Sequence, residues 1–425
     1  MFFIFIIDLM VAFSALFLMI FIRYGRGDFI ANLNTHFIPF FIIITLFILI
    51  FYIFNLYSFR FNKNITEFTN SFVKSLIVSF SISVLIFYIF GDFFKLTPKT
   101  NLVLFTGIFG IIDFYLRVLI KRYLTKEKIG RKIIIISEKK DSLVEELNQN
   151  QNMGYEIIKE TESFNLDEII NLKPEVVVIN SIEGKEFDKI YTIIKRGIFV
   201  YTVNNFYEEI FLKVPTEKIE KNEVVDYLSK NKTIFIFIKR ILDIVLSLML
   251  ILILSPIFLV IAILIKITSN GPILFRHTRI SLNDTEFTIY KFRSMYTDAE
   301  KNGAVWTENN KEDLRITPLG RFIRKTHLDE IPQLVNILKG NISFVGPRPE
   351  RPEFVSELRK DILYYDLRHS VKSGLTGWAQ VNYKYGSSVE DAREKLKYDF
   401  YYIKNRNTFF DLLIILKTVA KIFTY

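Results

Sequence analysis

The sequence contains no cysteine among its 425 residues. This absence excludes disulfide bonds, thiolate metal sites and cysteine nucleophiles. The lysines are spread along the chain and no nucleic-acid-binding motif is visible, so we expect no nucleic-acid partner. The formal net charge is +10. A positive balance of this kind suits an anionic membrane surface or phosphorylated substrates.

Long hydrophobic runs dominate the composition, since half of the residues are hydrophobic and 43 are phenylalanine. The pattern is typical of a membrane protein that also has soluble parts. The length allows two or three domains of about 150 residues each. Four apolar segments open the chain, each near the ~20 residues that span a hydrocarbon core: 1–22, 36–57, 73–91 and 101–120.

A basic cluster, KRYLTKEKIGRK at 121–132, follows the fourth segment. It is the strongest such cluster beside any span, which predicts a cytoplasmic position and hence a cytoplasmic N-terminus. Within the fourth segment, Asp113 and Arg117 are four residues apart. This spacing suits a local ion pair, and the alternative is a transport relay.

An α/β pattern begins at Arg131. KIIIIS, GYEIIKE, EVVVIN and GIFVYTV are typical of strands, and DSLVEELNQN of a helix. The pattern predicts a small Rossmann-like layer. Its first strand runs into SEKKD without the glycine-rich turn that holds a dinucleotide phosphate, which favours a structural or regulatory role.

A fifth apolar run, 239–266, contains Ser255 and Pro256. The proline removes a helix hydrogen bond and favours a kink, and the serine hydroxyl could bond the freed carbonyl. Basic residues flank both ends, so both ends should face the cytoplasm. A re-entrant helix satisfies this condition, and the alternative is a kinked fifth span.

The C-terminal segment concentrates charged groups suited to phosphate chemistry. Lys291 and Arg293 in KFRSM would face the same side of a strand. Asp329 and Glu330 precede a helix expected from Pro332 to Leu338, where backbone N–H groups favour anions. The GPRPE loop carries Arg348, whose guanidinium can hold a phosphate. Two carboxylates with several cations indicate phosphoryl transfer, one carboxylate attacking phosphorus and the other binding Mg²⁺.

The segment from Lys239 to Tyr425 resembles the bacterial sugar transferases, the monotopic phosphoglycosyl transferases. The resemblance rests on KRILD, LSP, GPILFRHTRI, FTIYKFRSM, RITPLGRFIRKTHLDEIPQLVNILKG, SFVGPRPE, SGLTGWAQVNYKYG and KYDFYYIKNR, in this order. The family usually has glutamine at His277, glycine at Ser281 and Asp284, and serine at His327. Asn283 and Asp284 can still form a turn.

The resemblance implies a reaction and the residues that perform it. A nucleotide diphosphate sugar, by family habit a UDP-sugar, gives its sugar-1-phosphate to polyprenyl (undecaprenyl) phosphate, which opens exopolysaccharide, capsule or O-antigen (lipopolysaccharide) assembly. Asp329 would be the nucleophile and Glu330 the Mg²⁺ ligand. The residues expected around the phosphates or substrate are Lys291, Arg293, Arg324, Arg348 and Asp399, and Ser255-Pro256 would break the re-entrant helix.

The expected fold class is an α+β membrane protein of the bacterial inner (cytoplasmic) membrane with its catalytic domain on the cytoplasmic face. The expected parts are a four-helix transmembrane bundle (1–122), a Rossmann-like α/β domain (123–212), a linker (213–236) and a monotopic catalytic domain (237–425) with a re-entrant membrane helix. The large forms of the family can form homodimers. The alternatives are a catalytically silent membrane scaffold or regulator, a Mg²⁺-dependent phosphohydrolase and a transporter.

Overall fold

The computed structural model describes residues 2–54, 56–57, 65–91, 99–126, 131–137, 142–149, 154–180, 187–216, 219, 232–297, 299, 313, 315–383, 386 and 388–422. The chain divides into two compact units, Met1–Val203 and Asn204–Tyr425. Much of the linker expected at 213–236 and part of SEKKD lie outside the described residues.

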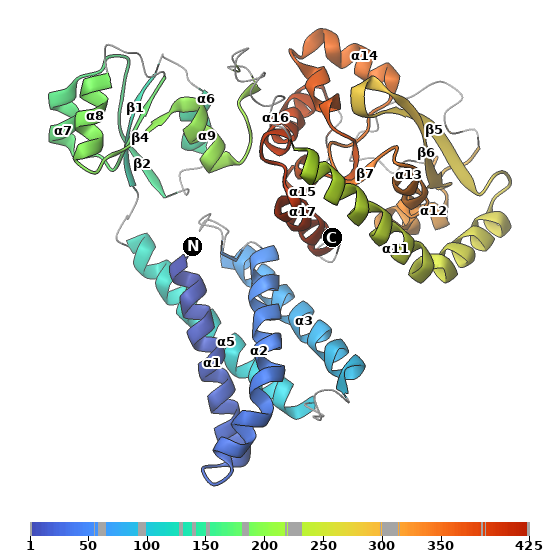
Figure 1. The fold of residues 1–425 in the computed structure, drawn as a ribbon, viewed down its shortest axis with the longest axis horizontal. Coiled ribbons are helices and arrows are strands. Elements are labelled where there is room, and N and C mark those ends of the chain that lie inside the picture. The colour runs from blue at the N-terminus through green and yellow to red at the C-terminus, as the bar shows by residue number, and fades with distance from the viewer. Residues whose placement is uncertain are drawn as a thin grey trace. The chain divides into compact units, whose positions relative to one another are not determined.

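Four long apolar helices open the first unit, as the sequence predicts: α1 (Phe2–Tyr24), α2 (Phe29–Ile53), α3 (Ile65–Ile89) and α5 (Lys99–Lys126) (Figure 1). Each is long and apolar enough to cross a membrane. Helix α1 packs on α2 and α5, and α3 packs on the same two helices. Phenylalanine rings fill the contacts, with the rings of Phe40 and Phe105 5.3 Å apart and edge-on. Edge-on contacts of this kind are favourable for aromatic pairs.

The α/β part of the first unit is a parallel four-stranded sheet in the order β2-β1-β3-β4. Its strands are β1 (Arg131–Ile136), β2 (Tyr155–Thr161), β3 (Val176–Ile179) and β4 (Phe199–Thr202), and its helices are α6 (Ser142–Gln149), α7 (Leu166–Leu172) and α8 (Phe187–Lys195). Strand residues such as Ile134 and Val177 pack on Ile169 of α7 and Ile190 of α8. The predicted Rossmann-like layer is confirmed in its strands and their parallel pairing.

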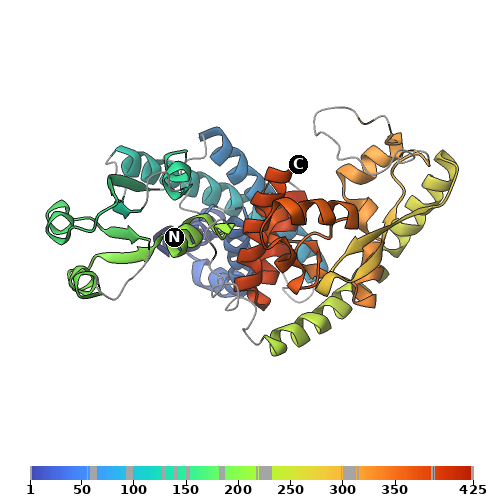
Figure 2. The ribbon, with the colours of Figure 1, turned by 90° about the horizontal axis from the view of Figure 1, so that it is seen from above.

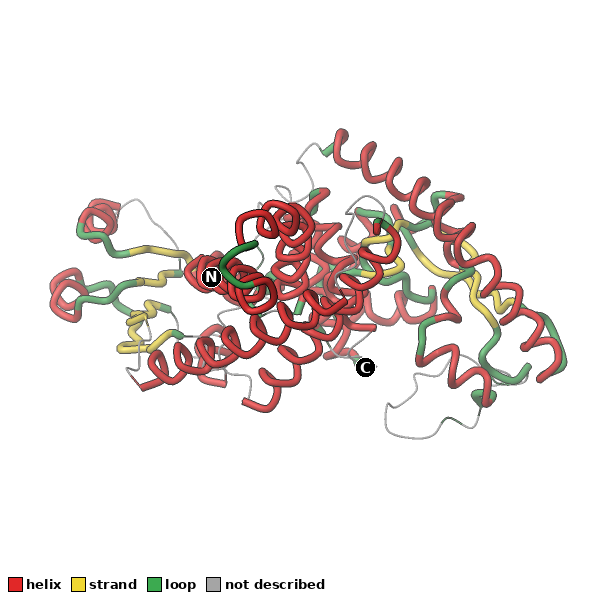
Figure 3. Tube along the Cα trace, turned by 90° about the horizontal axis from the view of Figure 1, so that it is seen from below, coloured by secondary structure: helices red, strands yellow, loops and turns green. Residues whose placement is uncertain are grey.

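The second unit is mostly helical, with few strands (Figure 3). Its strands are β5 (Leu274–Ile280), β6 (Glu286–Phe292), β7 (Ser343–Val345) and β8 (Gly374–Thr376), and its helices are α9 (Val203–Phe211), α11 (Thr233–Thr268), α12 (Pro318–Lys325), α13 (Gln333–Lys339), α14 (Pro352–Asp361), α15 (Trp378–Asn382), α16 (Val389–Asn405) and α17 (Thr408–Ile422).

An antiparallel hairpin of β5 and β6 forms the long yellow ribbon of Figure 2. Asn283 and Asp284 join the strands with φ of 53° and 59°. These are left-handed conformations, which Asn and Asp tolerate better than most residues. The expected turn at these two positions is therefore present.

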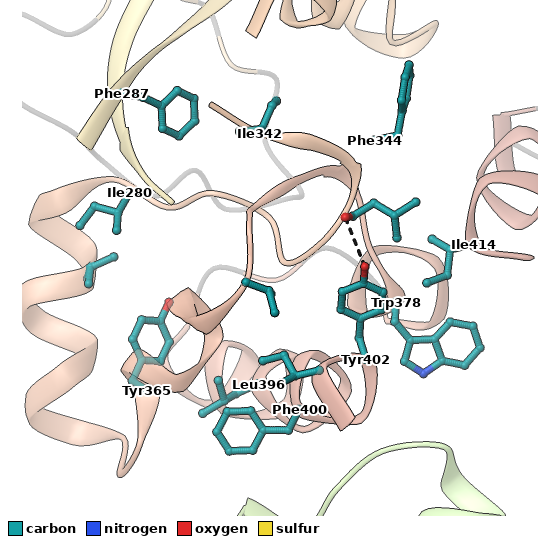
Figure 4. Close-up of a cluster of buried hydrophobic side chains, with 14 of the residues drawn as sticks. Ile280, Phe287, Ile342, Phe344, Tyr365, Trp378, Leu396, Phe400, Tyr402 and Ile414 are labelled. Carbon is teal, nitrogen blue, oxygen red and sulfur yellow. Dashed lines mark hydrogen bonds between the residues drawn. The ribbon is translucent and has the colours of Figure 1, made fainter. Parts of the chain in front are cut away.

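One hydrophobic core joins the hairpin to the C-terminal helices. It includes Phe287 of β6, Phe344 of β7, Trp378 of α15 and Phe400 of α16 (Figure 4). The hydroxyl of Tyr402 also donates to the Val345 carbonyl, 3.4 Å away. Helix α16 is therefore fixed against the short β7 strand that leads into the GPRPE loop.

Helix α11 changes direction part-way along its length (Figure 1). Pro256 has no N–H to donate to the carbonyl of Leu252, four residues earlier. The hydroxyl of Ser255 donates to that same carbonyl, at 2.8 Å. The predicted use of Ser255 to satisfy the freed carbonyl is therefore confirmed.

Three polar side chains fasten the first part of α11 to the rest of the second unit. Lys239 donates to the Val345 carbonyl and pairs with Asp411. Arg240 donates to the Ile337 carbonyl at 2.7 Å and to the Leu338 carbonyl at 2.6 Å, at the end of α13. Asp243 accepts hydrogen bonds from Ser343 and from the backbone N–H of Phe344. The charged residues of the KRILD motif therefore fix the first part of α11 to the rest of the second unit.

Candidate active site

Asp329 and Glu330 lie in a short 3₁₀ turn, η3 (Leu328–Glu330), between α12 and α13. His327 precedes the turn with φ of 56°, a left-handed conformation that ends the helical path of α12. The following helix, α13, begins at Gln333 with Pro332 as its N-cap, and the two carboxylates precede it in a separate turn. Gly340, with φ of 83°, ends that helix.

Two cations hold Glu330. The Lys291 ammonium donates to Glu330 Oε1 at 2.6 Å, and Arg348 Nη2 donates to the same oxygen at 3.0 Å. Lys291 comes from β6 and Arg348 from the GPRPE loop, so three separate segments meet at one carboxylate oxygen. Two positive charges share one negative charge, and this group is therefore suited to attract a phosphate.

The pKa values of the two neighbouring carboxyl groups are shifted in opposite directions. Burial raises the pKa of Asp329, although Lys291 acts against this. Burial alone would also raise the pKa of Glu330, but Lys291 and Arg348 together hold it well below its ordinary value. Glu330 is therefore a permanent anion, while Asp329 is the more basic of the two. Adjacent carboxyl groups with separated pKa values are typical of groups with different chemical roles.

The other predicted phosphate ligands occupy different places. Arg324 is exposed in the last turn of α12 and lies close enough to Asp329 to influence its pKa. Arg293 lines the same cavity as the two carboxylates, and its guanidinium donates to the carbonyl and hydroxyl of Ser269 at the end of α11. Asp399 is fully buried in α16.

Sequence reasoning missed Arg368, which connects Asp399 to the GPRPE loop. Its Nη2 lies 3.0 Å from Asp399 Oδ2 and donates to the Arg348 carbonyl. Its Nη1 donates to the hydroxyl of Tyr365 at 2.6 Å. Arg368 lies in an irregular 3₁₀ segment, η4 (Tyr365–Ser370), where no periodicity marks an inward-facing residue.

These side chains border one cavity of about 1790 Å³ in the second unit. Its polar lining includes Lys291, Arg324, Asp329, Glu330, Arg348, Arg368, Lys395 and Asp399. Leu250, Leu254 and Phe258 of α11 line it as well. The cavity therefore brings charged groups and the apolar face of a long helix into one space, which suits a ligand with a phosphate group and a hydrocarbon chain.

Two glycines bring the loops around the cavity into backbone contact. Gly346 donates to the Thr376 carbonyl and Gly374 donates to the Pro347 carbonyl, both at 2.9 Å. A Cβ added to Gly346 would overlap the carbonyl oxygen of Lys372, and one added to Gly374 would overlap the N–H of Gly346. Only glycine allows this crossing, which sets the position of Arg348.

A second group of possible metal ligands, Asp284, Asp366 and His369, lies outside the cavity. Arg359 donates to both carboxylates, and His369 is hydrogen-bonded to Asp284 at 2.7 Å. Burial lowers the pKa of His369 to about 4. The guanidinium already supplies the cation that these carboxylates need, so this cluster is a surface ion-pair network.

A model of the bacterial sugar transferase family matches residues 234–425. An exopolysaccharide production protein of Rhizobium leguminosarum is 39% identical over 192 residues, which cover 43% of this chain and 94% of that protein. The chain therefore belongs to the bacterial sugar transferase family.

Longer relatives carry more specific names. A UDP-N-acetylgalactosamine-undecaprenyl-phosphate N-acetylgalactosaminephosphotransferase of Aeromonas hydrophila is 40% identical over 225 residues, covering 53% of this chain and 52% of that protein. A UDP-glucose:undecaprenyl-phosphate glucose-1-phosphate transferase of Escherichia coli is 40% identical over 186 residues, covering 43% of this chain and 40% of that protein. The chain thus spans about half the length of these curated relatives.

The buried pair of Asp399 and Arg368 predicts a pH dependence of stability. Burial raises the pKa of Asp399 to about 6 from an ordinary value of 3.8, although Arg368 opposes the shift. The folded state therefore binds the proton more tightly than the unfolded state does. The free energy of unfolding should fall as the pH rises from about 4 to 6, by roughly 2–3 kcal/mol from this group.

Thermal unfolding of the wild type, Asp399→Asn and an exposed control, Asp361→Asn, should be compared across this pH range. The amide that replaces the Asp399 carboxyl group cannot titrate. The difference in stability between the wild type and Asp399→Asn should therefore change with pH, while Asp361→Asn follows the wild type. A difference that stays constant from pH 4 to 6 contradicts the assignment.

Proposed function

We propose that this protein transfers a sugar-1-phosphate from a UDP-sugar to a polyprenyl phosphate and so initiates the assembly of a surface glycan. The names of the relatives from Aeromonas hydrophila and Escherichia coli describe this reaction class. The observation that carries the proposal is the Asp329–Glu330 pair, whose pKa values move in opposite directions at a cavity lined by cations.

Asp329 is the nucleophile in this proposal. One carboxylate oxygen attacks the phosphorus that bears the sugar, the bond from phosphorus to the bridging oxygen breaks, and uridine monophosphate leaves with the electron pair. A phosphosugar–aspartyl intermediate remains. A phosphate oxygen of the polyprenyl phosphate then attacks the same phosphorus, the bond to Asp329 breaks, and the free carboxylate returns. Its raised pKa makes Asp329 a better nucleophile once it is ionised.

The cations around Asp329 stabilise the negative charge of the transferring group. Burial lowers the pKa of Lys291, but its hydrogen bond to Glu330 favours the ammonium form. Arg348 is fixed by the loop crossing and is held on the cavity side of Glu330. Arg324 adds a third cation at the exposed edge. Prepositioned cations of this kind need little reorganisation during the reaction.

Glu330 fits the role of a Mg²⁺ ligand. Its low pKa keeps it ionised, so Glu330 would hold the ion as a carboxylate ligand. Mg²⁺ prefers one or two carboxylates together with phosphate oxygens and water, which this cavity can combine. The ion would add positive charge at the diphosphate.

The reaction requires the cavity to lie at a membrane face. We propose that α1, α2, α3 and α5 form a transmembrane bundle in the bacterial inner membrane, and that the bend of α11 makes it a re-entrant helix. Both of its ends would then lie on the cytoplasmic face with the cavity. The exposed apolar residues on its outer side include Leu252 and Leu259, which suit contact with lipid. A homodimer is part of this proposal.

Asp329→Asn should reduce turnover on the order of 10³–10⁵-fold, because the amide cannot form an acyl phosphate. Its thermal stability should stay close to that of the wild type, since the two side chains have the same shape. Wild-type enzyme incubated with donor and Mg²⁺ but without lipid should gain the mass of one phosphosugar at Asp329. A folded Asp329→Asn variant with near wild-type turnover would refute the nucleophile.

Removal of divalent metal should abolish turnover, and added Mg²⁺ should restore it. Glu330→Gln should need a higher Mg²⁺ concentration for half-maximal rate, because the neutral amide binds the ion less strongly. Glu357→Gln, an exposed change in α14, is the matched control. Full activity in excess EDTA, or an unchanged Mg²⁺ dependence in Glu330→Gln, would rule out this assignment.

Labelling of single cysteines can test the path of α11, since the chain has no native cysteine. Ile236→Cys and Asn270→Cys lie near the two ends of the helix and are both exposed. An impermeant reagent should reach both only from the cytoplasmic side, while Arg26→Cys in the turn after α1 should react from the other side. Labelling of positions 236 and 270 from opposite faces would mean that α11 crosses the membrane.

A further inference from the structure

A buried ion cluster lies between α1 and α5 in the first unit. The sequence pairs Asp113 with Arg117, and the structure shows Nε of Arg117 donating to Asp113 Oδ2 at 2.8 Å. It adds a second carboxylate, because Nη2 of Arg117 donates to Asp8 Oδ2. Nη1 donates to the Leu56 carbonyl at 2.8 Å, so every side of the guanidinium is engaged.

The cluster is shielded from solvent and contains two carboxyl groups but only one guanidinium. Asp8 and Asp113 are completely buried, and Arg117 is 6% exposed. The rings of Phe51 and Tyr57 cover the guanidinium, with their centroids 5.4 and 5.3 Å from its central carbon. With both carboxylates ionised, the cluster would carry a net negative charge within helices apolar enough to span a membrane, where an uncompensated charge is very unfavourable.

Two buried carboxylate oxygens at this place, Asp8 Oδ1 and Asp113 Oδ1, lack a hydrogen-bond partner among the described residues. Buried polar atoms are nearly always paired, so their position indicates a bound species. In the described part of the first unit, the titratable groups facing Asp8 are Asp113 and Arg117 from α5 and Tyr57 from the segment after α2. None of these adds a second positive charge.

We propose that this cluster is a proton-binding site, in which one proton is shared between the carboxyl groups of Asp8 and Asp113. The proton bonds to an oxygen of one carboxyl group and is donated toward the other. One protonated and one ionised carboxyl group then face one guanidinium, and the cluster is neutral. A proton needs only these two oxygens, whereas a metal cation would require additional oxygen ligands. The proposal is independent of the transferase reaction.

The site can be tested by infrared spectroscopy of the full chain in lipid nanodiscs at pH 8, where Asp399 is ionised. The wild type should show the carbonyl stretch of a protonated carboxylic acid, with a shift in ²H₂O. Asp8→Asn and Asp113→Asn should each lose that band from the difference spectrum, because a single remaining carboxylate pairs with Arg117 and needs no proton. Asp28→Asn, an exposed change in the turn before α2, should keep the band.

Stability provides the second measurement. Each single variant should unfold at nearly the wild-type temperature, since each keeps a neutral pair. The double variant should unfold at a clearly lower temperature, because Arg117 then has no counter-ion. Absence of the band from the wild type, or its survival in either single variant, would overturn the proposal. Wild-type stability that depends on Na⁺ or K⁺ at constant ionic strength would overturn it too and would indicate a bound cation.

Discussion

Glu330 accepts hydrogen bonds from Lys291 and Arg348 at one oxygen, and the geometry of the cavity depends on this contact. Lys291 is partly buried and Arg348 stands on a loop, so the two cations would repel each other without the carboxylate between them. The same contact separates the pKa values of the two adjacent acids, because Glu330 takes most of the positive potential and Asp329 is left to burial. The positions of Lys291 and Arg348 and the separation of the two pKa values therefore have the same physical origin.

The long helix α11 is fixed to the same part of the second unit. Its first part is fixed by Lys239, Arg240 and Asp243, each bonded to a backbone or side-chain group of the catalytic segment. Beyond Pro256, Ile261 and Ile265 of the helix pack in one apolar cluster with Phe292 and Ile323. A charged lysine and arginine before an apolar run are usually taken as signs of membrane topology. Here both are bonded within the protein, so their position before the apolar run is explained by these contacts.

Regular sequence patterns made the helices and strands predictable. The parts that depend on local backbone conformation could not be predicted. Long apolar runs identified the helices, and short β-branched runs identified the parallel sheet. The place of Lys291 near the acidic residues was implied by the family resemblance, and its bond to Glu330 is seen only in the structure. Arg293 lines the same cavity but is bonded to Ser269 at the end of α11, a contact that its place in the sequence does not reveal. The separate turn of Asp329 depends on the left-handed His327, and the contact of Asp8 with Arg117 joins residues 109 positions apart. No local pattern encodes either.

The glycine crossing links two loops that are far apart in the sequence. Gly346 and Gly374 hold the GPRPE loop and the β8 loop together through backbone atoms alone, with hydrogen bonds in both directions. Neither loop can shift without the other, because no side chain lies between them to absorb a change. When segments are exchanged between related enzymes to alter sugar preference, these two loops should therefore be exchanged together. A chimera that takes only one of them would pair that loop with a partner whose backbone was not shaped to fit it.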